Sequence, residues 1–241
     1  MRTLVVIATY NEIENLPRLV KAVLELTLDI DVLVIDDQSP DGTGRWAREY
    51  ATQDHRLQLI ERPGKLGLGT ASITGLKYAV THRYDCVVTM DADFSHDPKY
   101  IPQLVTRLST DEQPAVDVVI GSRYVPGGGV QGWPLRRRWM SRAINRYARS
   151  FLRLRVADCS GAFRCYRIAA LQHFQLDRIR SSGYSYLEEI LWLLQRQGTA
   201  FAEIPIVFVD RQKGHSKINW REAIFALWFI FRLGILGAPR S

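Results

Sequence analysis

The sequence predicts an α/β protein with a doubly wound, mostly parallel sheet and helices on both faces. Short apolar runs rich in Val, Ile and Leu alternate with amphipathic stretches about every 25 to 30 residues, as in successive βαβ units. The chain has 241 residues, of which 46% are hydrophobic, which suits one large globular domain. No internal repeat, low-complexity tract or linker divides it, so we expect a single domain over residues 1–241.

The first half of the chain contains five expected strands, each short, β-branched and bounded by turn residues. The first, residues 4–8, precedes a helix that Glu14 or Asn15 opens and that continues to Leu26. The others are residues 32–35, 57–60, 86–90 and 116–120, and the helices between them are expected at 45–51, 70–81 and 98–108. A glycine-rich stretch, residues 64–69, separates the third strand from its helix.

The second half departs from this alternation after three consecutive glycines at 127–129. Helices are expected at 135–154 and 168–174 and from about 183 to 197, followed by a last strand at 202–209. A very apolar stretch at 223–238 ends the sequence and is interrupted by Arg232. It is short for a membrane-spanning helix, which needs about 20 apolar residues, and a central Arg is costly there.

Two carboxylates, Asp91 and Asp93, directly follow the fourth expected strand. Alternate side chains of an extended segment point the same way, so both can converge on one point just past the strand. Hard oxygen ligands at a strand end suit Mg²⁺ or Mn²⁺ that substrate phosphates also hold. For this tripeptide alone the alternative is a polar turn, with Asp97 capping the next helix.

Polar clusters recur at the ends of the first, second, fourth and fifth strands: Tyr10/Glu12, Asp36/Asp37, Asp91/Asp93 and Arg123. In open α/β sheets, ligands bind outside the carboxyl ends of the strands. One polar strand end carries little information, whereas four on the same edge indicate a site. We therefore expect these residues to border one crevice.

The net charge of +7 is concentrated in the expected helix 135–154, where arginines at 138, 142, 146, 149 and 153 share one face. Such a face seeks anions, and no nucleic-acid-binding module accompanies it. It is either a solvated surface or a membrane-binding one. The apolar tail is expected to pack on the domain, to lie in the plane of a membrane or to dock on a membrane partner. The three cysteines are too few for a disulfide framework, and no signal peptide opens the sequence, so a reduced cytoplasmic compartment is expected.

The ordered set of motifs resembles glycosyltransferase family 2 with the GT-A fold, and within it the dolichol-phosphate (polyprenol-phosphate) mannosyltransferases. The motifs lie at residues 8–12, 36–43 (with Ser-Pro-Asp-Gly-Thr), 67–70, 90–96, 121–124 and 214–217 (Gly-x-Ser-Lys). The resemblance covers nearly the whole chain. It implies mannose transfer from GDP-mannose to a polyprenyl phosphate at the cytoplasmic face of a membrane, by a peripheral enzyme that uses Mg²⁺ or Mn²⁺.

The resemblance also implies residue roles. Guanosine would contact Ala8, Tyr10, Glu12, Ile35 and Asp37. The nucleotide or the metal would meet Asp91, Ala92 and Asp93, with Ser95 as a further metal ligand, and the phosphates would meet Arg123, Arg211 and Lys217. Asp91, Asp93 and Arg123 would be the catalytic residues. Two positions depart from the family pattern: Ala8 stands where Pro is usual, and Ser95 where some members have Gln.

The resemblance further implies that residues 1–125 bind the nucleotide sugar, 126–218 form the acceptor side and 219–241 associate with a membrane. A phosphate acceptor is already an anion and needs no general base, and attack opposite the leaving group would give a β-linked product. Glu188 and Glu189 remain candidates for a base, with a solvated helix position as the alternative for at least one of them.

Three other functions are alternatives to this one. A dinucleotide-binding dehydrogenase would need Gly-x-Gly-x-x-Gly after the first strand, where Thr9-Tyr10-Asn11-Glu12 stands instead. A nonenzymatic membrane-binding module would not explain polar clusters at four strand ends. The near alternative is a family 2 enzyme that uses UDP-glucose and the same lipid.

Overall fold

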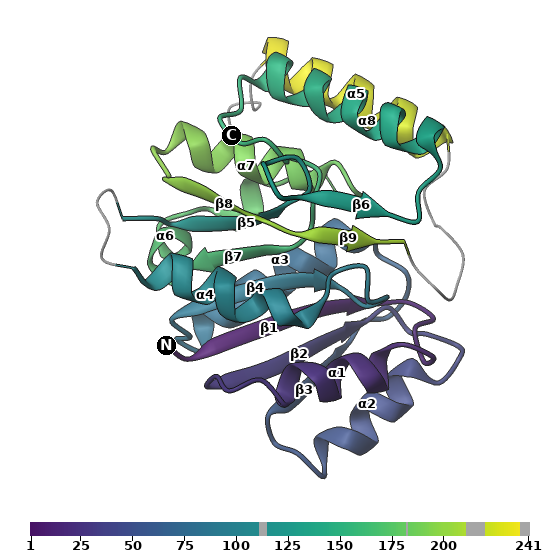
Figure 1. Ribbon diagram of the computed structural model, residues 1–241. Helices are drawn as coiled ribbons and strands as arrows, with labels where there is room; N and C mark the ends of the chain where they lie inside the picture. Colours follow the sequence, from purple (N-terminus) through teal and green to yellow (C-terminus); the bar gives the residue numbers. More distant parts are fainter. Residues whose placement is uncertain (111–114, 182, 211–219, 237–241) are drawn as a thin grey trace.

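The computed structural model describes residues 1–110, 115–181, 183–210 and 220–236, and the side chains of the last segment from residue 227. A central sheet lies between two helical layers, as Figure 1 shows. The expected α/β fold with a mostly parallel sheet is therefore confirmed.

The central sheet has seven strands in the order β3-β2-β1-β4-β7-β5-β8. Strands β1 to β4 run parallel to one another, and β5 runs parallel to β8. Strand β7 is antiparallel to both of its neighbours, β4 and β5. Their bounds are Thr3–Thr9 (β1), Ile30–Asp36 (β2), Leu57–Glu61 (β3), Cys86–Asp91 (β4), Val118–Ser122 (β5), Arg164–Arg167 (β7) and Phe201–Pro205 (β8).

Two features of the sheet differ from the sequence prediction. Strand β7 was missed because its four residues, Arg-Cys-Tyr-Arg, show neither an apolar run nor a clean alternation, although Arg164 is fully buried. The expected strand 202–209 is two strands: after β8 the chain leaves the sheet at Ile206, and β9 (Val207–Val209) pairs with β6 (Gly129–Gln131) in a small second sheet.

One face of the central sheet is covered by α1 (Leu16–Leu24), α2 (Thr43–Ala51) and α4 (Ile101–Ser109), which pack on Val5, Ile7, Val34 and Val88 of the strands. Helix α4 follows a short 3₁₀ turn, η1 (Pro98–Tyr100), so the expected helix 98–108 begins as 3₁₀. The 3₁₀ turn is capped by Asp97, whose carboxylate accepts a hydrogen bond of 3.0 Å from the amide of Lys99.

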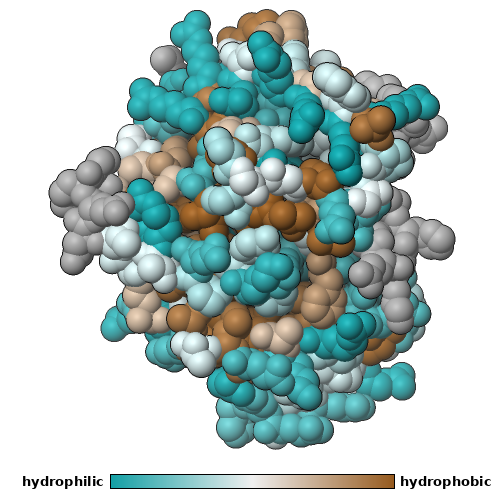
Figure 2. Space-filling model, in the orientation of Figure 1, coloured by the Kyte–Doolittle hydropathy of each residue, from teal (hydrophilic) through white to brown (hydrophobic). Residues whose placement is uncertain are grey.

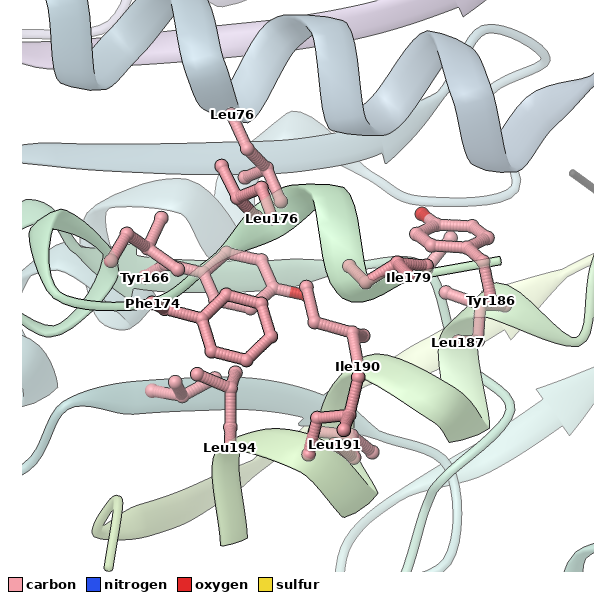
Figure 3. Close-up of a cluster of buried hydrophobic side chains, with 14 of the residues drawn as sticks. Leu76, Tyr166, Phe174, Leu176, Ile179, Tyr186, Leu187, Ile190, Leu191 and Leu194 are labelled. Atoms are coloured by element: carbon pink, nitrogen blue, oxygen red, sulfur yellow. The ribbon is translucent and has the colours of Figure 1, made fainter. Parts of the chain in front are cut away.

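The opposite face is covered by α3 (Leu68–Thr81), α6 (Ile168–Gln172), the 3₁₀ turn η2 (Leu176–Arg178) and α7 (Tyr186–Arg196). Figure 3 shows Leu76 of α3 beside Tyr166 of β7, and Ile190, Leu191 and Leu194 of α7 in the same apolar cluster. This cluster fixes α7, and therefore the two glutamates of its first turn, against the sheet.

Helices α5 (Leu135–Leu152) and α8 (Trp220–Leu236) lie side by side outside this layer, at the top of Figure 1. Ala148 and Leu152 of α5 and Ile230 and Leu233 of α8 are buried in the same core as α7. The ring of Phe151 lies 5.4 Å from that of Phe231 and against Gly234, where any side chain would clash. The apolar tail therefore packs on the domain through one face.

Candidate active site

A pocket opens at the carboxyl edge of β2, β1 and β4. It is formed by the loops after these strands, the start of α3 and the segment before α7. It is lined by Ala8, Thr9, Tyr10, Glu12, Asp37, Lys65, Gly67, Leu68, Ala71, Asp91, Ala92, Asp93, Gly183 and Tyr184.

The structure brings seven of the predicted site residues together in this pocket: Ala8, Tyr10, Glu12, Asp37, Asp91, Ala92 and Asp93. Ile35 and Ser95 are buried beside it without lining it. Arg123 does not line it either, because β7 separates the ends of β4 and β5. Arg211 and Lys217 lie outside the described residues.

The Ser-Pro-Asp-Gly-Thr motif joins the loop after β2 to the loop after β1. The Ser39 hydroxyl accepts a hydrogen bond from the Asn11 amide at 2.9 Å, and the Asp41 carboxylate accepts one from the Ile13 amide at 3.0 Å. The Thr43 hydroxyl accepts from the Glu12 amide at 3.0 Å. The motif thus holds in place the loop that carries Tyr10 and Glu12.

Asp37 fixes the glycine-rich loop that forms another wall of the pocket. Its carboxylate pairs with the buried guanidinium of Arg62 and accepts hydrogen bonds from the amides of Leu66 and Gly67 at 3.0 and 3.2 Å. Lys65, between these anchors, places its ammonium 4.7 Å from the centroid of the Tyr10 ring, a cation–π contact. Lys65 is the only basic residue among the described residues that line the pocket.

His96 braces the end of β4, where Asp91 and Asp93 enter the pocket. Its Nδ1 accepts a hydrogen bond of 3.1 Å from the Asp91 amide, and its ring stacks on Phe163 with centroids 5.0 Å apart. Burial lowers the pKa of His96 to about 4, against the opposing charge of Asp93, so the imidazole is neutral at pH 7. The neutral ring can accept from the backbone without adding positive charge beside the two carboxylates.

The oxygen groups at this strand end fit a divalent cation. Asp91 and Asp93 both line the pocket, and the hydroxyl of the adjacent Ser95 is buried without a hydrogen-bond partner among the described residues. Carboxylate and hydroxyl oxygens are the hard ligands that Mg²⁺ and Mn²⁺ prefer. The described residues contain no cluster of three or more His, Cys, Asp or Glu that could hold a metal. A cation here would therefore complete its coordination with substrate oxygens or water.

Strained backbone gathers at this edge of the sheet. Asn11, Gln38 and Phe94 have φ angles of 58°, 55° and 61°, in the left-handed region. They follow β1, β2 and β4 respectively, the three strands whose ends border the pocket. Left-handed conformations of residues other than glycine are uncommon and cluster at functional sites.

The Arg123 side chain is buried against Asp158, and its contact with the substrate phosphates stays a prediction. The carboxylate accepts hydrogen bonds of 2.7 Å from both Nε and Nη2 and one of 3.0 Å from the Arg123 amide. Burial raises the pKa of Asp158, but the charge and hydrogen bonds of Arg123 outweigh burial and lower it, so the pair is ionised. The guanidinium also lies 5.6 Å from the ring of Phe208, which packs on His96.

The two glutamates of α7 are both buried, so the expectation of a solvated position is wrong. Glu189 accepts hydrogen bonds from the amides of Arg180 and Ser181. Burial raises the pKa of Glu188 to about 7, partly offset by the charges of Arg164 and Arg123. Neither glutamate lines the pocket, so the structure does not place either as a general base there.

Helices α5 and α8 expose large apolar side chains next to arginines. Trp139 is 70% exposed, Trp228 52% and Phe231 47%, while Arg142 and Arg146 are exposed on α5. Figure 2 shows hydrophobic and hydrophilic residues interspersed at the top of the molecule, where these helices lie. No helix among the described residues is long and apolar enough to cross a membrane.

Sequence reasoning missed several residues of the pocket wall, chiefly Lys65, Leu68 and Tyr184. For Lys65 a signal was present, since a lysine inside the glycine-rich stretch after the third strand could have been assigned to the same sheet edge. Tyr184 had no such signal, because it reaches the pocket from a segment far along the chain.

The chain resembles known proteins over most of its length. Residues 4–174 match the model of the family described as glycosyl transferase family 2. The chain is 41% identical over 219 residues to undecaprenyl-phosphate mannosyltransferase of Micrococcus luteus, covering 91% of this chain and 88% of that protein. It is 40% identical over 228 residues to polyprenol monophosphomannose synthase of Mycolicibacterium smegmatis, covering 93% and 84% respectively.

Among solved structures, glucosyl-3-phosphoglycerate synthase from Mycobacterium tuberculosis shares the fold at low sequence identity. Its complex with Mn²⁺, UDP and glucosyl-3-phosphoglycerate matches with a TM-score of 0.65 at 18% identity, covering 99% of this chain and 81% of that one. Its complex with Mn²⁺ and UDP-glucose matches with a TM-score of 0.63 at 19% identity, covering 99% and 80%.

Proposed function

The chain belongs to glycosyl transferase family 2, and on that premise we propose that it transfers mannose from GDP-mannose to a polyprenyl phosphate. The product would be a polyprenyl β-mannosyl phosphate, formed with inversion at the sugar. Two relatives about 40% identical over most of the chain, a mannosyltransferase and a monophosphomannose synthase, support the sugar and the lipid class. The observation that carries the proposal is the pocket that places Tyr10 and Glu12 beside Asp91 and Asp93.

The charge of the pocket favours a donor that is bound together with a cation. Its described lining contains four carboxylates, Glu12, Asp37, Asp91 and Asp93, and one lysine. Arg62 neutralises Asp37, which leaves an excess of negative charge where a diphosphate must bind. A divalent cation held by Asp91 and Asp93 would offset this repulsion and stabilise the charge that develops on the leaving nucleoside diphosphate.

The remaining residues have roles in binding and orientation. Tyr10 and Glu12, held by the Ser-Pro-Asp-Gly-Thr motif, would contact the nucleoside, and Lys65 would contact the donor from the opposite wall. Arg211 and Lys217 would meet the phosphates, as the family resemblance implies. Because the acceptor phosphate is an anion at neutral pH, it needs no general base, so none of the carboxylates that line the pocket has to act as one.

The lipid acceptor favours a peripheral position at a membrane surface, with the cytoplasmic face as our expectation. The exposed arginines and aromatic side chains of α5 and α8 form a surface suited to anionic headgroups and to the boundary of the acyl chains. Membrane association through this surface would bring the enzyme to its acceptor.

The function is tested by transfer of radiolabelled mannose from GDP-mannose to a short polyprenyl phosphate by the purified protein. We expect lipid-linked mannose, inhibition by GDP at concentrations where UDP has little effect, and loss of transfer in chelator. Transfer from UDP-glucose in preference to GDP-mannose would overturn the donor assignment. Transfer to free sugars, without transfer to the lipid phosphate, would overturn the acceptor assignment.

The membrane surface is tested separately. Replacing Arg142, Arg146 and Arg149 with Glu should weaken binding to anionic vesicles, and raised salt should weaken binding of the unaltered protein because exposed charges are screened. A matched charge reversal far from this surface, at Lys21, Arg45 and Arg83, should leave binding unchanged. Equal effects of the two triple variants would show that only net charge matters and would contradict the proposed surface.

A further inference from the structure

Asn145 stands apart from the rest of α5. It is 4% exposed and is the only buried polar side chain that the described part of this helix carries, whereas arginines and Trp139 of the same helix face solvent. Burying an amide is costly unless its donors and acceptors are paired. A buried asparagine on an otherwise exposed helix therefore needs a specific partner.

Its partner is the backbone of the loop between α5 and β7. The Asn145 amide donates a hydrogen bond of 2.6 Å to the carbonyl of Ala157, and its Oδ1 accepts one of 2.9 Å from the amide of Cys159. The thiol of Cys159 also donates to this Oδ1 at 3.1 Å. Hydrogen bonds from Asn145 thus hold the residues on either side of Asp158.

Asp158 in turn holds Arg123. Besides its bonds to Arg123, the carboxylate accepts a hydrogen bond of 3.0 Å from the Gly161 amide, so both oxygens are fully engaged. The same loop is held from the sheet side by Glu203, which accepts from the amides of Ala157 and Asp158 at 2.5 and 3.0 Å. The position of the Arg123 guanidinium therefore depends on how this loop is fixed.

Arg123 lies close to the reacting end of the pocket. The ring of Phe208 contacts both the guanidinium of Arg123 and the imidazole of His96, and His96 accepts a hydrogen bond from the amide of Asp91. Phe208 and His96 therefore link the guanidinium to the strand end that carries the carboxylate pair.

The contact through Asn145 belongs to a stripe along α5. Arg137 pairs with Asp210 at 3.0 Å, the Ser141 hydroxyl bonds to that of Tyr124 at 2.7 Å, and Asn145 holds the loop around Asp158. Residues four apart on a helix share one face. Ser141 and Asn145 thus join α5 to segments that adjoin Arg123, namely Tyr124 and the loop around Asp158. Arg137 joins α5 to Asp210, the residue before the predicted phosphate-binding Arg211.

We propose that Asn145 is a positioning residue that holds the Arg123–Asp158 pair in register with α5 and so sets where the Arg123 charge acts on the reacting phosphates. The inference rests on the proposed function for its kinetic consequence. Asn145 acts through Asp158 and touches no substrate. Misplacing a charged group by about 1 Å can lower a rate by about 10²-fold, so a small shift of the loop would be measurable.

The kinetic test compares Asn145→Ala with Leu152→Ala, a truncation of a buried side chain on the same helix that makes no hydrogen bond to the loop around Asp158. Both variants lose stability, and each is assayed below its own unfolding transition. We expect kcat for transfer to polyprenyl phosphate to fall about 10-fold or more in Asn145→Ala and less than about 2-fold in Leu152→Ala. GDP affinity and vesicle binding should be unchanged in both. Equal kcat values in the two variants would overturn the inference.

A second readout does not depend on the reaction. The Nε–H of Arg123, buried against Asp158, should give a slowly exchanging ¹⁵N NMR signal, which is assigned by its loss in Arg123→Lys. The signal should move or exchange faster in Asn145→Ala and stay in place in Leu152→Ala; an unmoved signal in Asn145→Ala overturns the inference. If the unaltered protein transfers no mannose, the proposed function fails, but the NMR measurement still tests whether Asn145 positions Arg123. If Asn145→Ala does not fold, Glu203→Gln weakens the other anchor of the same loop, and the same shift is expected there.

Discussion

The two sides of the site are built differently. At the ends of β1, β2 and β4, carboxylates line an open pocket, and their loops are held by side chains of neighbouring loops, such as Ser39 and Asp41. On the other side, Arg123 and Asp158 are ionised and almost fully enclosed, and their pairing spans 35 residues of chain. The first side is arranged to receive a cation and a ligand, whereas the second has already matched its charges internally.

Carboxylates on the two sides should therefore contribute differently to binding and to stability. The side chain of Asp91 lines the pocket and is 33% exposed, so removing its charge should affect binding more than folding. A buried carboxylate compensates a buried cation, so removing it leaves that cation without a partner. Asp91 and Asp158 should therefore behave in opposite ways when each is replaced by Asn.

The largest expected effect is on stability at the enclosed side. Asp158→Asn leaves the Arg123 guanidinium buried without its counter-charge and should lower the free energy of unfolding by about 3–5 kcal/mol. Urea denaturation measures it, with Asp91→Asn as the control that should change stability by less than about 1 kcal/mol. Comparable losses in the two variants would erase the distinction between the two sides.

The second largest expected effect is on turnover, through the carboxylates that line the pocket. In free-energy terms it is nearly as large as the loss of stability. Asp93→Asn removes a charge aimed at the developing diphosphate, and we expect kcat to drop about 10²–10³-fold, the scale of losing one preorganised electrostatic contact. Steady-state transfer of mannose to the lipid measures this, with circular dichroism to verify the fold. Transfer at the unaltered rate, or full activity in chelator, would refute the metal assignment.

The pH dependence of stability should reveal the buried Glu188. Because burial raises its pKa to about 7 from an ordinary value of 4.5, the folded state keeps this proton while the unfolded state loses it. The protein should therefore lose stability relative to Glu188→Gln as pH rises from about 4.5 to about 7, by on the order of 3 kcal/mol, with no further change above that. Thermal unfolding of both proteins across this range measures the difference, and parallel curves would contradict the raised pKa.

The smallest expected effect concerns Lys65. Lys65→Ala removes the only basic side chain among the described lining of the pocket and should weaken GDP binding by roughly 10-fold, the scale of one charge-assisted hydrogen bond. Isothermal titration with GDP and with guanosine shows whether the contact is to phosphate or to the nucleoside. Lys77→Ala, whose ammonium pairs with Asp177 outside the pocket, is the matched control and should bind GDP normally.

The sequence by itself determined the first five strands, the pocket edge and most of its carboxylates. Buried parallel strands are continuous apolar runs, and the residues that follow them meet at one edge of the sheet, so Tyr10, Asp37 and Asp91 could be placed together from local pattern. The family resemblance is confirmed by the relatives and the family match, while the individual site roles stay predictions.

Only the tertiary structure decided what happens to Arg123, Glu188 and the last strand. The antiparallel strand β7, too short and too charged to be recognised as a strand, separates the end of β5, which precedes Arg123, from that of β4. The pairing of Arg123 with Asp158, and the grip of Asn145 on that loop, depend on contacts between segments that no local period connects. A buried charged side chain needs a partner within hydrogen-bond distance, and the fold supplies that partner from a segment distant in the sequence. Local sequence patterns therefore do not reveal which residues pair.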